Sequence, residues 1–295
     1  MSSISVLKST VRRTIGASLA VAAVALSASV GTAQSAPSNT FRWEKMEGQA
    51  NDIGVARDHI LWIVNNSTQP NGEYQLYTWN PVPKNWVDQK MSGVRVFAES
   101  GSDAPYVLKK DGQVWRRVNG TWTRTHTMQS MTAFASAGVN TMATLPDGQG
   151  RQFMIANDPD GLPGGVYQYS RDNSRWESLN NKTRMKKIAA DRFGNLWAID
   201  ETNYVWQYFM QSASWNKFGG QMGTAVAIGG TYGGGADAAL VYIVGMDKTL
   251  YKLVGDAFVK SGGNGANLME IASDEAGNVW SVTQDRQIFK GVLMR

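Results

Sequence analysis

The chain has 295 residues, with 29 Lys and Arg against 24 Asp and Glu, and no cysteine. The absence of cysteine excludes disulfides, thiolate chemistry and cysteine-based metal sites, while the length supports a substantial core. Eleven Trp and 31 Gly favour a protein of short strands and many turns with an aromatic core.

The N-terminal segment differs in composition from the rest. Lys8, Arg12 and Arg13 precede an uncharged run rich in Ala, Val and Ser over residues 15–30. This pattern is typical of a secretory signal peptide, and small residues at 31–33 predict cleavage near Gln34. The run is shorter than the roughly 20 residues that a membrane span needs. We therefore expect a signal peptide over residues 1–33, a spacer over 34–39, and a secreted or periplasmic protein with no membrane span after cleavage.

Removal of the signal peptide makes the protein almost neutral. The mature chain has 26 Lys and Arg against 24 Asp and Glu. Its dense basic spots are Arg116-Arg117 and Arg184 with Lys186-Lys187, and scattered solvated charge explains them better than a phosphate-binding stripe. We expect no nucleic-acid partner.

From Thr40 to Met46 apolar and polar residues alternate with period two, which predicts a strand with one buried face. Units of four predicted strands follow. The first strand of each unit consists of small or β-branched residues, at 52–56, 94–98, 132–135, 187–190, 224–228 and 269–272. The second is more hydrophobic, at 60–64, 105–108, 153–156, 196–199, 240–244 and 279–282. Gly194-Asn195 and Gly277-Asn278 supply tight turns before two of these second strands.

The third strand of each unit carries an apolar-aromatic pair, and the fourth carries an aromatic seven or nine residues later. The successive fourth-strand aromatics are Trp86, Trp122, Trp176, Trp215 and Phe258. Ile288-Phe289 is a pair with no following partner, and Trp43 is a partner with no preceding pair. One unit spans 54 residues, and we assign its excess to a loop insertion around residues 140–150.

The repeat predicts an all-β protein. We expect a six-bladed β-propeller over residues 40–295, closed by the N-terminal strand pairing with the C-terminal blade.

Two units, Trp176–Tyr208 (WESLNNKTRMKKIAADRFGNLWAIDETNYVWQY) and Phe258–Phe289 (FVKSGGNGANLMEIASDEAGNVWSVTQDRQIF), resemble the tectonin repeat. The resemblance implies a propeller of the tectonin and tachylectin kind, whose members are often secreted lectins that bind microbial surface glycans. The third unit lacks the Gly-Asn-Val-Trp element and the fifth has Gly233–Gly235 in its place, which argues against a site repeated in every blade. Asp191-x-x-Gly194 and Asp274-x-x-Gly277 also resemble the blades of streptogramin-lyase-like propellers at this hairpin.

Catalytic residues are scarce. His59 and His126 lie at non-equivalent repeat positions, and we expect both to be exposed or packed rather than catalytic bases. No Gly-x-Ser-x-Gly elbow and no His pair with metal-ligand spacing occurs in the sequence. Asp158-x-Asp160 is explained as a turn rather than a calcium loop. We expect no enzymatic activity, cofactor or metal.

Aromatic residues are the candidates for ligand binding, because an aromatic ring stacks on the apolar face of a sugar while polar neighbours satisfy its hydroxyls. We expect the fourth-strand aromatics to join adjacent sheets. A second aromatic on the third strand occurs in only some units, at Trp79, Tyr169 and Tyr208, with Asn80, Arg171 and Gln207 as polar neighbours. The sequence therefore predicts a secreted, non-enzymatic lectin-like protein that binds cell-surface glycans. The alternatives are an envelope or extracellular scaffold for a protein partner and, last, a streptogramin-lyase-like enzyme.

Overall fold

The computed structural model describes residues 41–56, 59–98, 105–125, 139–144, 152–156, 164–170, 175–179, 181–190, 195–229, 240–261, 267–274 and 276–294. These residues form strands and turns, and they include no helix long and apolar enough to cross a membrane. All of them fall within one compact unit, Pro37–Arg295.

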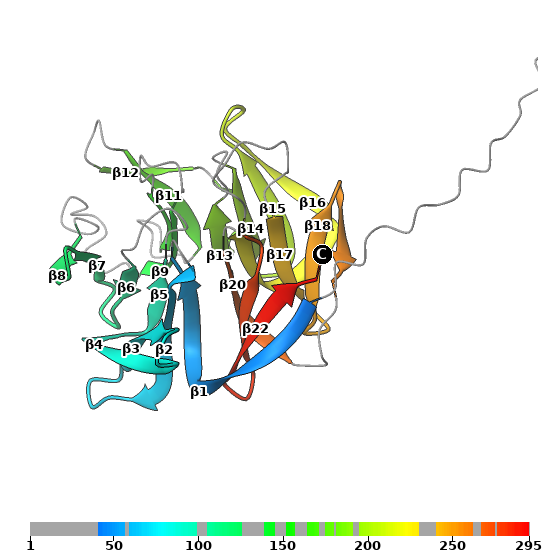
Figure 1. Ribbon diagram of the computed structural model, residues 1–295. Helices are drawn as coiled ribbons and strands as arrows, with labels where there is room; N and C mark the ends of the chain where they lie inside the picture. Colours follow the sequence, from blue (N-terminus) through cyan, green and yellow to red (C-terminus); the bar gives the residue numbers. More distant parts are fainter. Residues whose placement is uncertain are drawn as a thin grey trace, which may run out of the picture. The chain divides into compact units, whose positions relative to one another are not determined.

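Consecutive strands pair antiparallel and fall into groups of four (Figure 1). Two groups are separate sheets. One consists of β5 (Arg95–Phe97), β6 (Tyr106–Leu108), β7 (Val114–Val118) and β8 (Thr121–Arg124), and the other of β9 (Val139–Thr144), β10 (Gln152–Ala156), β11 (Gly165–Ser170) and β12 (Arg175–Ser178).

The remaining groups are joined in pairs by two long strands, β1 (Phe41–Val55) and β16 (Ser214–Gly229). β16 ends the group of β13 (Met185–Ala190), β14 (Leu196–Asp200) and β15 (Tyr204–Phe209), and begins the group of β17 (Leu240–Gly245), β18 (Leu250–Val254) and β19 (Ala257–Lys260). β1 ends the group of β20 (Leu268–Ser273), β21 (Val279–Thr283) and β22 (Gln287–Leu293), and begins the group of β2 (Leu61–Thr68), β3 (Tyr74–Asn80) and β4 (Asn85–Gly93).

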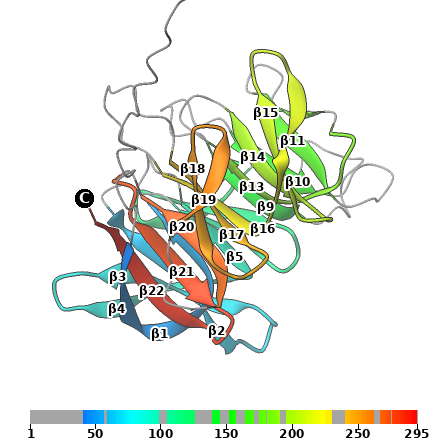
Figure 2. The same ribbon diagram turned by 90° about the vertical axis from the view of Figure 1, so that its right-hand side faces the viewer.

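The two ends of the folded chain pair with each other. The register of β1 against β22 runs from Phe41 opposite Leu293 to Met46 opposite Ile288, and both views show the blue and red strands side by side (Figures 1 and 2). Trp43 lies opposite Gly291, where an added Cβ would lie 3.1 Å from the rings of Phe41 and Trp43. The predicted pairing of the N-terminal strand with the C-terminal group is therefore confirmed.

The first strands of the groups contact one another in chain order: β1 contacts β5, β5 contacts β9, β9 contacts β13, β13 contacts β16, β16 contacts β20, and β20 contacts β1. A cavity of about 130 Å³ lies between β1, β5, β13, β16 and β20, and its lining includes Ile53, Val96, Ile188, Val226 and Ile271. Small and β-branched residues thus occupy these strands, as the repeat predicts.

One predicted first strand is wrong. The partner of β10 is β9 at Val139–Thr144, whereas residues 132–135, where we expected this strand, lie outside the described residues. The insertion predicted around residues 140–150 therefore overlaps a sheet strand. The sequence VNTMAT of β9 lacks the run of small apolar residues that marks the other first strands, so the pattern favoured the earlier segment.

Fourth-strand tryptophans join adjacent groups. The indole N–H of Trp86 donates to the carbonyl of Glu47 at 2.8 Å, and those of Trp122 and Trp215 donate to the carbonyls of Gln89 and Leu179 at 3.2 Å. In each case the acceptor lies three or four residues after the aromatic of the preceding group. The prediction that these aromatics join neighbouring sheets is confirmed for Trp122 and Trp215, whereas Trp86 joins two groups within one seven-stranded sheet.

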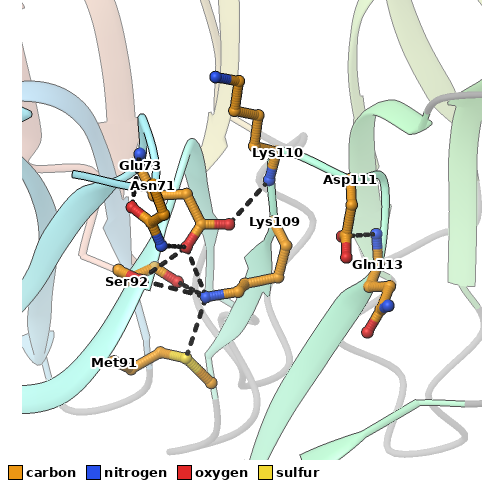
Figure 3. A network of polar contacts seen from close by, with 8 residues as sticks. All are labelled: Asn71, Glu73, Met91, Ser92, Lys109, Lys110, Asp111 and Gln113. Carbon is orange, nitrogen blue, oxygen red and sulfur yellow. Dashed lines mark hydrogen bonds and ion pairs between the residues drawn. The ribbon is translucent and has the colours of Figure 1, made fainter. Parts of the chain in front are cut away.

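A polar network joins the loop after β2 to the loop after β6 (Figure 3). The carboxylate of Glu73, 4% exposed, lies 2.6 Å from the ammonium group of Lys109 and accepts further hydrogen bonds from Ser92, Asn71 and the backbone N–H of Lys110. Burial acts to raise the pKa of Glu73, but the hydrogen bonds from Lys109, Ser92 and Lys110 outweigh it and lower the pKa. The network is therefore a buried, hydrogen-bonded ion pair between two adjacent groups of strands.

Candidate functional site

The structure places the three predicted site aromatics in three different groups of strands. Each lies directly across from the fourth-strand aromatic of its own group: Trp79 from Trp86, Tyr169 from Trp176, and Tyr208 from Trp215. The ring centroids of these pairs are 5.0, 5.4 and 5.0 Å apart. They therefore do not form one common site.

Their polar neighbours are equally separate. Asn80 accepts a hydrogen bond from the backbone N–H of Val82 in the turn after β3, and Gln207 pairs with Trp197 and Asn216 within its sheet. Arg171 lies outside the described residues. Tyr208 is only 5% exposed, which leaves no ring face for a sugar. Among the predicted aromatics, Tyr169 has the surroundings of a binding site.

Tyr169 lines a cavity of about 230 Å³ between the β5–β8 sheet and the β9–β12 sheet. We call it the inter-sheet cavity. Its lining comprises Arg116, Val118, Thr123, Arg124, Thr125, Gln152, Tyr169 and Trp176. Its described lining residues supply two aromatic rings, two guanidinium groups, an amide and hydroxyl groups, and none of these described residues is acidic. Small-molecule sites usually measure roughly 300–1,000 Å³, so this cavity suits a ligand the size of one sugar ring.

Two polar residues of the inter-sheet cavity are positioned by the buried Tyr106. Gln152 donates its amide N–H to the hydroxyl of Tyr106 at 2.9 Å, and the guanidinium of Arg116 lies over the Tyr106 ring, 5.2 Å from its centroid. Tyr106 is itself part of the core between the two sheets, with Leu108, Met154 and Trp176. The polar groups are therefore oriented by packed side chains, as a binding site requires.

In the part of the chain that the structure describes, two fourth-strand tryptophans, Trp43 and Trp176, lack the indole hydrogen bond that Trp86, Trp122 and Trp215 make. Trp176 is 6% exposed, and its Nε1 has no hydrogen-bond partner within the described ranges. By the spacing seen at the other tryptophans, its acceptor would be the carbonyl of Thr125. The N–H itself is enclosed, so Trp176 offers the inter-sheet cavity its ring rather than a hydrogen-bond donor.

A second polar cluster lies at the start of the first strands. Asp52 of β1 accepts a hydrogen bond from the backbone N–H of Val96 at 2.9 Å. Glu270 of β20 forms ion pairs with Lys187 of β13 and, at 3.8 Å, with Arg95 of β5. Burial raises the pKa of Asp52 to about 6, although Arg95 opposes this rise. The two carboxylates and the two basic groups come from four groups of strands, and their formal charges sum to zero.

His59 is exposed, one of the two environments that we expected, and it has an acidic partner. Its Nδ1 lies 2.5 Å from Oδ2 of Asp274, a carboxylate 1% exposed, while the His59 side chain is 54% exposed. Asp274 also accepts hydrogen bonds from the backbone N–H and the side-chain amide of Asn278. The pair joins the loop after β1 to the predicted Asp-x-x-Gly turn, in which Gly277 has a φ of +81°. His126, Asp158 and Asp160 lie outside the described residues.

The described residues form no cluster of metal-binding side chains. No group of three or more His, Asp or Glu side chains there is arranged to hold a metal ion.

The basic residues of the inter-sheet cavity were missed in the sequence. We interpreted Arg116-Arg117 as solvated charge, but alternation along β7 puts the two side chains on opposite faces. Arg116 lines the cavity, whereas Arg117 donates to Gln89 and lies over the Trp62 ring. The alternation was visible in the sequence, but the position of β7 beside β11 was not.

Comparison with known proteins identifies the fold. No family model matches the chain, and no curated protein sequence matches it. Solved structures do resemble it. The structure described as "YCF48 bound to D1 peptide" is 11% identical with a TM-score of 0.57, and the match covers 87% of this chain and 98% of that one. "WD40 beta propeller domain of Doa1" resembles it at 8% identity and a TM-score of 0.54, covering 87% and 96%. "Streptogramin B lyase structure" does so at 10% identity and a TM-score of 0.52, covering 86% and 98%.

The class of protein is therefore an all-β propeller, with groups of four antiparallel strands as its blades. The tectonin family itself remains a prediction, because identities this low define the fold alone.

Proposed function

We propose that this protein is a secreted, non-enzymatic lectin-like propeller, and that the inter-sheet cavity is a glycan-binding site. The observation that carries the proposal is the convergence of Tyr169 and Trp176 with Arg116, Arg124 and Gln152 around a cavity of about 230 Å³. Aromatic rings offer a surface for the apolar face of a sugar, and guanidinium and amide groups replace the water lost by its oxygens.

We also infer that the blades form a closed ring of six. Support comes from the pairing of β1 with β22 and from the contacts of each first strand with the next, including β20 with β1. Closure removes the free sheet edges that an open array would expose. Propellers tolerate variation in their loops, so blades of unequal length fit this arrangement.

A glycan array with the mature chain, read with and without competing free sugar, tests the lectin proposal. We expect binding that free sugar displaces, and a loss of about tenfold or more in affinity for Tyr169→Ala, since aromatic stacking supplies a large share of sugar-binding energy. Trp79→Ala is the matched control, because Trp79 holds the equivalent place in another sheet and does not line the inter-sheet cavity. An array without any competable binder contradicts the proposal.

A protein-binding scaffold is the second candidate. One structural neighbour is described as bound to a D1 peptide, which favours a propeller surface as a peptide platform. Co-purification of one stoichiometric partner that survives excess free sugar, with a blank glycan array, supports this candidate over the first.

The paired His59 and Asp274 give the lyase alternative its one specific observation. A histidine oriented by a buried carboxylate is a recognised arrangement for a general base. No group of His, Asp or Glu side chains among the described residues could hold a metal ion beside the pair, and we rank this candidate third. The lyase candidate predicts a substrate that the protein turns over and that the His59→Ala variant does not.

A further inference from the structure

We propose that Asn119 is a site of spontaneous deamidation, because the fold leaves this Asn-Gly pair open to reaction while it protects another. In an Asn-Gly pair the backbone nitrogen of the glycine attacks the side-chain carbonyl carbon of the asparagine, and the missing Cβ of glycine leaves the approach unhindered. The sequence contains three such pairs, Asn71-Gly72, Asn119-Gly120 and Asn264-Gly265. The structure describes the first two, and they differ in how their reacting groups are held.

The Asn119-Gly120 pair is the two-residue turn between β7 and β8. Val118 and Thr121 lie opposite each other across the hairpin, and the two turn residues have φ values of 49° and 79°. These left-handed values define a turn in which Asn-Gly is favoured. Both turn residues are exposed, and a Cβ added at Gly120 would meet nothing within 4 Å. Among the described residues, neither the side chain of Asn119 nor the backbone N–H of Gly120 makes a hydrogen bond.

The Asn71-Gly72 pair is held at each group that would react. The side-chain amide of Asn71 donates to the carboxylate of Glu73 at 2.9 Å, and its oxygen accepts the backbone N–H of Glu73 at 3.0 Å. The backbone N–H of Gly72, which would attack, donates to the carbonyl of Gln69 at 2.8 Å. Glu73 is itself fixed by its buried ion pair with Lys109 (Figure 3). Asn71 must therefore leave this network before it can react.

The reaction at Asn119 needs no reactant other than water. Attack of the Gly120 nitrogen on Cγ of Asn119 forms a cyclic imide and expels ammonia, which takes the proton of the Gly120 N–H. Water then opens the imide at either carbonyl and yields aspartate or isoaspartate. Each product adds a negative charge to the turn, and isoaspartate also adds a carbon to the main chain.

The products alter one wall of the inter-sheet cavity. Val118 and Thr123, on either side of the turn, both line that cavity. The register of Val118 against Thr121 depends on a turn of two residues, because loop length fixes the register of a hairpin. A main chain lengthened by isoaspartate disturbs this register. Deamidation of Asn119 thus changes the strand pair that carries the lining residues, whatever ligand the cavity binds.

Peptide mass spectrometry of stored protein tests the proposal. The mature protein is kept in mildly alkaline buffer with and without urea, and the conversion of amide to acid is followed separately in each Asn-Gly pair. Each hydrogen bond that must open lowers the reactive population by up to about tenfold. We therefore expect Asn119 of the folded protein to deamidate at least about tenfold faster than Asn71. In urea the two rates should be similar, because both pairs then lie in an unfolded chain.

Asn119→Gly is the matched variant, since Gly-Gly suits the same turn. It should keep the melting temperature and lose the isoaspartyl peptide that the wild type accumulates at the β7–β8 turn. The proposal is overturned if Asn119 reacts in urea but not in the folded protein. It is equally overturned if Asn119 of the folded protein reacts no faster than Asn71.

Discussion

Asp52 shows how a single carboxyl group on the propeller's first strands affects stability. Its pKa is raised from 3.8 to about 6, chiefly by burial, against the opposing influence of Arg95. The folded state therefore binds the proton more tightly than the unfolded state. The group's contribution favours folding at low pH and is lost as the pH rises from about 4 through about 6. At neutral pH the ionised carboxylate is a destabilising feature.

Asp52→Asn should accordingly stabilise the protein at pH 7.5 and leave it unchanged near pH 4. The pKa shift corresponds to a gain of up to roughly 3 kcal/mol, and the amide oxygen can still accept the N–H of Val96. Urea unfolding at both pH values measures the difference. A variant that is less stable at pH 7.5 would mean that Arg95 and Lys187 stabilise the carboxylate more than burial destabilises it.

At the scale of the strand, the buried pair of Glu73 and Lys109 joins two blades through their loops (Figure 3). Ser92, Asn71 and a backbone N–H also donate hydrogen bonds to Glu73, so both of its carboxylate oxygens have partners within the protein. Removing one partner of such a pair leaves a buried charge uncompensated, which is more damaging than removing both.

Lys109→Met should lower the free energy of unfolding at pH 7 by roughly 3–5 kcal/mol. The double variant Glu73→Gln/Lys109→Met should recover part of this loss, because no charge is left buried. Since the pKa of Glu73 is lowered in the fold, the wild-type advantage should also fade as the pH drops below the ordinary range of a glutamate. Equal stability of single variant and wild type across this range would show that the pair contributes nothing.

Much of the strand pattern was predictable from sequence, because period-two alternation and recurring aromatic spacing are local properties. The second-strand positions and the pairing of Trp43 with the C-terminal group follow from them. The strand β9 was misplaced because its residues lack the apolar signature of its equivalents. The turns before the third strands were also missed: they place Asn203, Lys248 and Arg286 at positive φ, where glycine would have been the recognisable signal.

The site was less predictable than the strands. Tyr169 was selected for occurring in only some units, yet its partners Arg116 and Arg124 lie on a different sheet. Which loops and sheets become neighbours depends on packing between blades, and no local pattern reports it. For the same reason the pairing of His59 with Asp274, distant in sequence, had no signal.

At the scale of the whole molecule, the N-terminal strand is the element on which our proposed ring closure depends. Phe41 packs in the core with Tyr242 and Leu268, and Trp43 packs against the same cluster. The strand therefore contributes both ladder hydrogen bonds and buried aromatic area to the last blade.

A chain starting at residue 47 should lose at least about 3–5 kcal/mol of stability, the usual cost of removing one buried phenylalanine. For a domain of this size that corresponds to a fall of roughly 10 °C or more in melting temperature. A chain starting at residue 40 is the control and should melt like the mature protein. If the two truncated chains melt at the same temperature, β1 does not close the fold.

Ligand location tests the account most directly. The mature protein crystallised with the sugar that its glycan array selects should show that sugar between β8 and β11, with its ring against Tyr169 and Trp176 and a polar substituent at Arg124. Sugar bound only at another surface, or in the cavity between the first strands, with the inter-sheet cavity empty, would contradict the account.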